Sequence, residues 1–233
     1  MIAENIKHLK ERIDIKCAEI GRNSQEIRLI AVSKFFGIDA INEANRLGID
    51  NFGENKAQEL RDKYEILGDK ITWHFIGTLQ RNKVKYAVKA ASFIHSVDSL
   101  ILADEINNQA QKISKVQKIL LEVKTSFEET KSGLDDYSKV FELAKHCSTL
   151  SNIELVGLMT MAAFTDDERV IRQSFSDLRK LKDEINQNGF DLSELSMGMT
   201  SDYEIAIEEG ATMLRIGSAI FGQRNTLKDW RQS

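Results

Sequence analysis

A lysine directly follows an apolar segment near the start of the chain. Residues 29–39 read LIAVSKFFGID, and Lys34 stands where a buried strand would end. One interpretation is an ordinary strand-end lysine, whose stem packs on apolar surface while its amine reaches water. The functional interpretation is an amine in a partly apolar pocket, because such an amine loses its proton more easily and can form a Schiff base with a carbonyl.

Two glycine-bearing segments near the other end of the chain have the composition of phosphate-binding loops. In SMGMTSDYEIAIEEG, Gly198 allows a tight turn, and Thr200 or Ser201 could cap the helix that follows. In RIGSAIFG, Gly217 would let the backbone approach an oxyanion and Ser218 supplies a hydroxyl. Each feature alone is more simply explained as an ordinary helix cap or glycine turn. Together they favour a phosphate site.

A ligand that used both features would carry a carbonyl at one end and a phosphate at the other. Pyridoxal phosphate has this chemistry, and so do the phosphorylated aldehyde or ketone substrates of barrel aldolases. The residue pattern does not choose between these two classes.

The elements that would position these residues alternate between helix and strand along the whole chain. Strands are predicted at 28–33, 49–52, 71–77, 92–97, 118–125, 153–161, 192–198 and 211–217. Helices are predicted at 2–21, 38–47, 55–66, 82–90, from 99, 135–147, 167–188 and 201–209. This alternation indicates parallel βαβ units. No G-x-G-x-x-G follows the first strand, and eight strands fit a single (β/α)₈ TIM barrel in one domain spanning 1–233.

A barrel of this kind gathers its functional groups at the carboxyl ends of the strands, and phosphate frequently binds beyond strands seven and eight. Lys34 and both candidate phosphate loops fall at such ends. His74, His95 and Asp98 also lie at predicted strand ends. Because buried polar groups are normally paired, structural hydrogen bonds explain these three as well as a ligand does, and we leave them out of the predicted site.

Composition excludes several classes of function. The 233 residues carry a net charge of −4 and no basic tract stands out, so we expect no nucleic-acid partner. No apolar run is long enough for a membrane span and the N-terminus has no signal-peptide core, which predicts a cytoplasmic protein. Cys17 and Cys147 lack metal-ligand spacing, so we expect buried, reduced thiols and no metal.

Seven segments in order along the chain resemble the pyridoxal phosphate homeostasis protein family, which shares the barrel of alanine racemase. They are IAVSK at 30–34, FGENKAQE at 52–59, WHFIGTLQRNK at 73–83, IHSVDS at 94–99, EETKSGL at 128–134, VGLMTMA at 156–162 and LSMGMTSDYEIAIEEGATMLRIGSAIFG at 195–222. The resemblance covers nearly the whole chain. It implies an alanine racemase-like barrel of the fold type III group that binds pyridoxal 5'-phosphate (PLP).

The resemblance also implies roles for individual residues. Lys34 matches the lysine that forms the Schiff base with PLP, and Thr200, Gly217 and Ser218 match phosphate-binding positions. Arg215 matches the arginine that faces the pyridine nitrogen, where a permanent charge disfavours protonation and makes the ring a weak electron sink.

Two segments near the expected cofactor carry weaker signals. Asn55 belongs to a G-E-N motif of the family, although a helix N-cap explains an asparagine before KAQEL equally well. After the lysine the family usually has S-K-x-x-P, whereas Phe35, Phe36 and Gly37 follow here and the chain has no proline. The turn beside the cofactor is therefore expected to differ in rigidity and exposure. Lys56 also replaces a common aromatic residue.

The resemblance implies a protein of PLP homeostasis that holds the cofactor reversibly for buffering or for delivery to PLP-dependent apoenzymes. We expect a monomer. Alanine racemase carries a second, β domain that supplies an acid/base on the opposite face, and we expect no such domain here. The alternatives are a PLP-dependent enzyme with weak amino-acid racemase activity and a phospho-sugar aldolase. Lys131 in EETKSGL could accept cofactor in transit, but a solvated loop lysine is the simpler interpretation.

Overall fold

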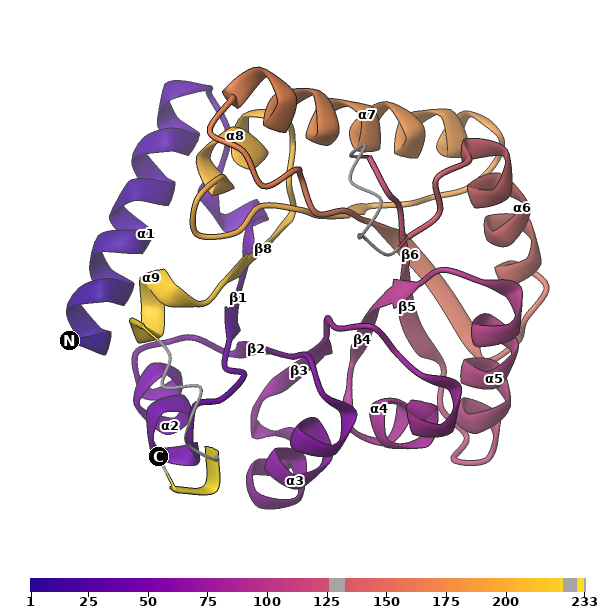
Figure 1. The fold of residues 1–233 in the computed structure, drawn as a ribbon, viewed down its shortest axis with the longest axis horizontal. Helices are drawn as coiled ribbons and strands as arrows, with labels where there is room; N and C mark the ends of the chain where they lie inside the picture. The colour runs from indigo at the N-terminus through magenta and orange to yellow at the C-terminus, as the bar shows by residue number, and fades with distance from the viewer. Residues whose placement is uncertain (126–132, 224–229, 233) are drawn as a thin grey trace.

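The strands form one closed barrel. The computed structural model describes residues 1–125, 133–223 and 230–232, so Lys131 lies outside the described residues. Each strand pairs in parallel with the next, and β8 pairs with β1 (Figure 1). The strands are β1 (Arg28–Val32), β2 (Asn51–Glu54), β3 (Thr72–Phe75), β4 (Phe93–Val97), β5 (Gln117–Glu122), β6 (Ile153–Met159), β7 (Glu194–Ser196) and β8 (Met213–Ile216). The predicted (β/α)₈ fold is confirmed.

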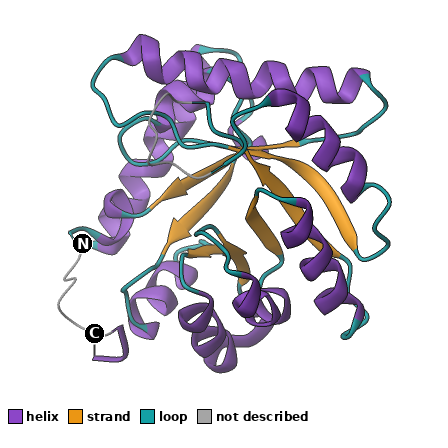
Figure 2. Ribbon diagram, turned by 45° about the vertical axis from the view of Figure 1, so that its right-hand side comes forward, coloured by secondary structure: helices purple, strands orange, loops and turns teal. Residues whose placement is uncertain are grey.

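Helices surround the strands on the outside of the barrel (Figure 2). They are α1 (Ile2–Glu19), α2 (Ile38–Arg46), α3 (Ala57–Leu67), α4 (Val84–Ala90), α5 (Leu100–Gln111), α6 (Tyr137–Cys147), α7 (Glu168–Gln187), α8 (Tyr203–Glu208) and α9 (Ser218–Phe221). Short 3₁₀ turns cover Ser24–Glu26, Gly68–Lys70, Arg81–Lys83 and Trp230–Gln232. Helix α9 was not predicted, because one turn of helix is too short to show a periodic pattern. Within the described parts of the chain, no helix has the length and apolarity to cross a membrane.

Two apolar cores fill the structure. The larger lies between the barrel wall and the helices, and the smaller contains Ile30 of β1, Leu120 of β5 and Met213 of β8. Because β1 and β5 are not neighbours in the sheet, side chains from both can meet only inside the barrel. Alternation along the strands then leaves the next inward positions for polar groups such as Arg215, two residues beyond Met213.

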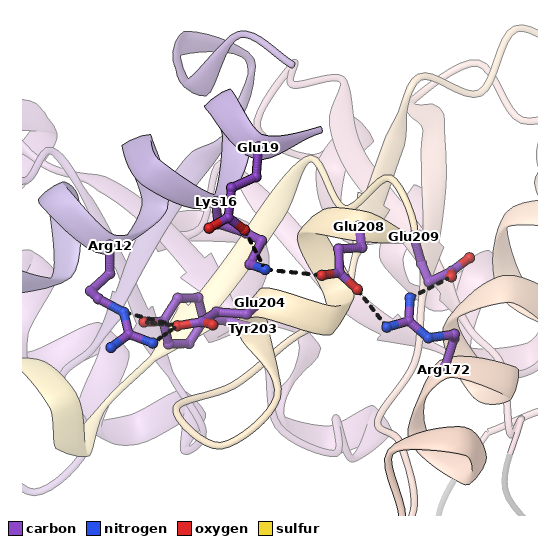
Figure 3. A network of polar contacts seen from close by, with 8 residues as sticks. All are labelled: Arg12, Lys16, Glu19, Arg172, Tyr203, Glu204, Glu208 and Glu209. Atoms are coloured by element: carbon purple, nitrogen blue, oxygen red, sulfur yellow. Dashed lines mark hydrogen bonds and ion pairs between the residues drawn. The ribbon is translucent and has the colours of Figure 1, made fainter. Parts of the chain in front are cut away.

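Helix α8 is held between α1 and α7 by ion pairs (Figure 3). Lys16 of α1 lies 3.0 Å from Glu208, and Arg172 of α7 binds the other carboxylate oxygen of Glu208 and also lies 3.1 Å from Glu209. Arg12 of α1 binds Glu204. The helix that follows the 198–202 turn is therefore fixed from two sides.

The two cysteines are buried free thiols in α1 and α6, as predicted. Burial raises the pKa of Cys147 to about 12, which makes this thiol inert at neutral pH. Among the residues that the structure describes, no group of three or more His, Cys, Asp or Glu side chains could hold a metal ion.

Candidate functional site

Lys34 follows β1 at the carboxyl end of the barrel. The ladder between β1 and β2 extends one residue past the strand, since the Ser33 amide donates to the Gly53 carbonyl at 3.1 Å. Ser33 is fully buried, whereas Lys34 is half-buried. Ile30 lies inside the barrel, so the two-residue alternation of β1 directs position 34 to the mouth. This is where a reactive amine could meet a ligand.

The structure brings Thr200 and Ser218 together. Ser218 Oγ lies 3.2 Å from Thr200 Oγ1, and the Ala219 amide donates to Thr200 Oγ1 at 3.4 Å. Two hydroxyls and an amide of α9 thus converge beyond β7 and β8, a combination that can bind an anion. Gly217 immediately precedes this helix.

The predicted cap of α8 is wrong. Asp202 occupies the N-cap position, and neither Thr200 nor Ser201 caps the helix. The Asp202 carboxylate accepts the Met199 amide at 2.5 Å, which closes the turn around Gly198. Gly198 has a φ of +94°, and a Cβ there would lie 2.6 Å from Ala206 Cβ. This tight turn directs the Thr200 hydroxyl toward α9 instead of back to α8.

Arg215 lies inside the barrel and is 5% exposed. Its Nη1 donates to Ser196 Oγ at 2.6 Å, and its Nη2 donates to the Thr160 carbonyl at 2.8 Å. Burial lowers the Arg215 pKa to about 10, against the opposing effects of Asp202 and Glu122. The guanidinium therefore stays charged near neutral pH in a fixed orientation.

A chain of hydrogen bonds continues from Ser196 across the barrel. Ser196 Oγ lies 2.9 Å from His95 Nδ1, His95 Nε2 lies 2.9 Å from His74 Nδ1, and His74 Nε2 lies 3.0 Å from Asn51 Oδ1. Burial lowers the pKa of His74 to about 3 and that of His95 well below its ordinary value, so both rings are neutral.

The direction of this chain follows from Asn51, because its Oδ1 atom can only accept. A neutral His74 therefore carries its proton on Nε2 and accepts from His95 Nε2 at Nδ1. His95 in turn accepts at Nδ1, so Ser196 Oγ donates its proton there and accepts from the Arg215 guanidinium. Every polar hydrogen in the chain has an acceptor. His74 and His95 thus both have hydrogen-bond partners within the protein.

Glu122 is a further polar residue at this level that the sequence pattern did not single out. It ends β5 and is 3% exposed. Burial raises the Glu122 pKa to about 7, with a smaller contribution from Asp98 in the same direction and an opposing one from Arg215. Ser196 and Thr160, the two partners of Arg215, were also left out of the predicted site. Strand alternation alone could have found Glu122, since it is a polar residue two positions beyond the inward-facing Leu120.

Asn55 does not cap α3. Lys56 occupies the N-cap position of this helix and no side chain caps it, so the alternative interpretation of Asn55 is wrong. The Asn55 Oδ1 atom is buried and accepts no hydrogen bond from the described protein. A Cβ at Gly77 would lie 2.3 Å from the Asn55 carbonyl, so the loop after β3 packs directly against this residue. A buried acceptor without a donor suits a ligand.

These features fit a ligand with an aldehyde, a phosphate and a polar ring. The amine of Lys34, the hydroxyls of Thr200 and Ser218, the orphaned oxygen of Asn55 and the fixed cation of Arg215 supply complementary chemistry. Four of these residues follow a strand of the closed parallel barrel and Arg215 is the last but one residue of β8, so the topology places all five toward one end of the molecule.

Comparison with known proteins places the chain in a family. Residues 2–225 match the family model described as "Alanine racemase, N-terminal domain". The chain is 41% identical over 223 residues to a pyridoxal phosphate homeostasis protein of Aquifex aeolicus, covering 95% of this chain and 97% of the relative. A relative of the same name from Vibrio alginolyticus is 37% identical over 229 residues, covering 96% and 98%.

A solved structure supports the same assignment. PipY of Synechococcus elongatus, determined with PLP bound, superposes with a TM-score of 0.83 at 34% identity, covering 95% of this chain and all of PipY. Sequence, family model and structure agree over nearly the full length of the chain. The chain belongs to the pyridoxal phosphate homeostasis protein family, built on the alanine racemase N-terminal barrel.

Proposed function

We propose that this chain is a PLP-binding protein of intracellular PLP homeostasis, holding the cofactor as a reversible Schiff base on Lys34 for buffering or delivery. The proposed site consists of Lys34, Asn55, Thr200, Arg215, Gly217 and Ser218. Its support from outside the chain is the name shared by the relatives and the PLP bound to PipY.

One observation in the structure carries the proposal. Strands β1 and β8 are paired, with Ala31 opposite Ile216, so Lys34 and Ser218 lie just beyond the carboxyl ends of neighbouring strands. The site has an amine on one side and two hydroxyls with a helix amide on the other. This arrangement suits a ligand that carries both a carbonyl and an anionic group. PLP has both.

Each residue then has a distinct task. Thr200, Ser218 and the Ala219 amide would donate to phosphate oxygens, and the charged Arg215 would disfavour a proton on a ring nitrogen beside it. The Lys34 amine would condense with the aldehyde that bound PLP supplies, with formation of a C=N bond and release of water. A ring that stays unprotonated withdraws electrons weakly, which favours holding the cofactor over turning over amino acids.

Replacing Lys34 tests the site. Lys34→Ala should remove the visible absorbance of the PLP complex and the adduct trapped by borohydride, because no amine is left to condense with the aldehyde. Absorbance and mass spectra of purified protein measure both. Lys124→Ala is the matched control, since Lys124 is also half-buried just beyond a strand, β5. A trapped adduct that persists in Lys34→Ala would assign the Schiff base to another lysine. A colourless wild-type protein would favour the aldolase alternative.

A second experiment separates holding from catalysis. Loaded protein should transfer PLP to a PLP-dependent apoenzyme and restore its activity, with no loss of optical purity in a panel of amino acids. Racemisation at about 1 per second or faster would instead assign an enzymatic role.

We propose that the chain acts as one domain spanning 1–233 and as a monomer in the cytoplasm. PLP-dependent apoenzymes would be the recipients of the cofactor. Sedimentation of the loaded and unloaded protein tests the oligomeric state.

A further inference from the structure

The turn after Lys34 has an unusual backbone. Phe35 has a φ of +71°, one of two positive values among the described non-glycine residues. The left-handed region is unfavourable for an aromatic residue, and such conformations persist only where the surroundings hold them. Neither proline nor glycine stands at this position, so another part of the protein must stabilise the turn.

Glu59 of α3 provides this support. Its Oε1 atom accepts the Phe35 amide at 2.9 Å, and the same oxygen accepts Lys63 Nζ at 2.8 Å. Glu59 is 5% exposed and Lys63 is fully buried. A charged acceptor in a low-dielectric site makes a strong hydrogen bond to a backbone amide.

Lys63 holds the other side of the turn. Its amine donates to the Ser33 carbonyl at 2.9 Å and to Glu54 Oε1 at 2.7 Å, and Glu54 Oε1 also accepts the Ser33 hydroxyl at 2.7 Å. The Ser33 carbonyl and the Phe35 amide belong to the two peptide bonds that flank the Cα of Lys34. Both peptide planes of Lys34 are therefore hydrogen-bonded to one buried cluster of charges.

This cluster is a costly way to stabilise a fold. Burial raises the Glu54 pKa against the opposing effect of Lys63, and Glu54 Oε2 accepts no hydrogen bond from the described protein. Trp230 covers the cluster, with its ring centroid 5.2 Å from Lys63 Nζ. Because buried ion pairs contribute little net stability compared with apolar residues of similar size, their value here lies in the geometry that they impose.

We propose that Glu54, Glu59 and Lys63 are positioning residues that fix the backbone on both sides of Lys34 and thereby control how fast its amine captures and releases an aldehyde. The inference rests on the proposed function, because it assumes that Lys34 condenses with PLP. The cluster holds the turn in a chain that has no proline to restrict its backbone.

Glu59 offers the sharpest test. Glu59→Ala and the bulkier Glu59→Met remove the acceptor of the Phe35 amide but leave Lys63 paired with Glu54, so both variants are expected to fold. Glu59→Gln keeps an acceptor oxygen and serves as the conservative variant. Glu65→Gln is the matched control, since Glu65 is an exposed carboxylate on the same helix.

Three measurements are compared. Hydrogen exchange of the Phe35 amide in ligand-free protein should accelerate about tenfold or more in Glu59→Ala and Glu59→Met and remain slow in Glu59→Gln and Glu65→Gln. The rate of PLP adduct formation, followed by absorbance, should fall about tenfold in the first two variants. Affinity for pyridoxine 5'-phosphate, which has the phosphate but no aldehyde, should stay within about twofold, because the phosphate site lies on other loops.

A double variant separates positioning from general damage. Adding Phe35→Gly to Glu59→Ala should recover part of the lost adduct rate, because glycine adopts a positive φ without strain. Faster exchange with an unchanged adduct rate would overturn the inference and leave the proposed function standing. Unchanged exchange would also overturn it. A further outcome is a wild-type protein that forms no adduct, while the exchange rate of the Phe35 amide still depends on Glu59. That result would refute the proposed function but not the role of Glu59 in holding the backbone beside Lys34.

Discussion

At the scale of single residues, the orientation of Arg215 is the most constrained feature of the site. Its guanidinium has two acceptors, Ser196 Oγ and the Thr160 carbonyl, and the first begins a one-directional chain through two neutral histidines. A donor that is fixed before the ligand arrives loses little entropy on binding. Arg215 is thus prepared to face a ring atom without rearrangement.

Removing the Ser196 hydroxyl should therefore destabilise the protein. Ser196→Ala leaves a buried donor and a buried acceptor without their partner, which costs about 1–3 kcal/mol. Denaturant unfolding measures the loss. Ser96→Ala is the matched control, because Ser96 is also a buried serine of the barrel but its hydroxyl has no partner in the described protein, and it should change little. Equal losses in both variants would contradict the directed chain.

At the scale of elements, short segments carry the site and longer ones hold them in place. Helix α9 spans only Ser218–Phe221 and α8 only Tyr203–Glu208, so neither is stable through its own length. Ion pairs from α1 and α7 fix α8 (Figure 3), and the turn around Gly198 connects this helix to the barrel. The Thr200–Ser218 pair depends on this support.

The contribution of the ion pairs should depend on salt. Arg172→Ala removes the partner of Glu208 and Glu209. Because the guanidinium is partly exposed, the free energy of unfolding should fall by only about 0.5–1 kcal/mol at low ionic strength. In about 1 M NaCl the difference from wild type should shrink, because the Debye length falls to about 3 Å. Lys139→Ala, which breaks an isolated exposed pair with Asp135, should have almost no effect at either salt concentration. A loss in Arg172→Ala that salt leaves unchanged would indicate packing instead of charge.

At the scale of the whole molecule, the barrel concentrates polar groups in its interior above a small apolar core. Glu122 and Arg215 lie within this interior, while Ile30, Leu120 and Met213 fill the core. Such an arrangement positions a charged site but lowers stability wherever an ionised group is poorly solvated.

Stability should therefore depend on pH through Glu122. Its folded-state pKa is raised to about 7 from 4.5, so between these values the folded protein binds a proton that the unfolded chain has lost, and stability falls as the pH rises. The ionised carboxylate costs about 3 kcal/mol above pH 7. Glu122→Gln should stabilise the protein at about pH 8 and much less at about pH 5. Unfolding curves at the two values test this, with the exposed Glu142→Gln as control. Equal effects at both values would show that Glu122 does not titrate with folding.

The sequence by itself determined the barrel, the order of its elements and the family. Alternating strand and helix patterns indicate parallel βαβ units. The motifs from IAVSK to GSAIFG occur in the order expected for the family. Lys34 and Ser218 could be placed near each other because the ends of parallel strands share one face. These properties follow from local residue patterns and from the order of the strands and helices, and both can be read directly from the sequence.

Only the tertiary structure decided which side chains support the site. The link from Arg215 to Ser196, His95 and His74 joins four strands, and the cluster beneath Lys34 joins β2, α3 and the turn that follows β1. The tertiary structure also overturned the predicted cap at Thr200 and the alternative interpretation of Asn55 as a cap. A hydrogen bond between residues far apart in sequence forms only when the donor and acceptor are positioned to within a few tenths of an ångström. No pattern of residue types encodes positions that precisely.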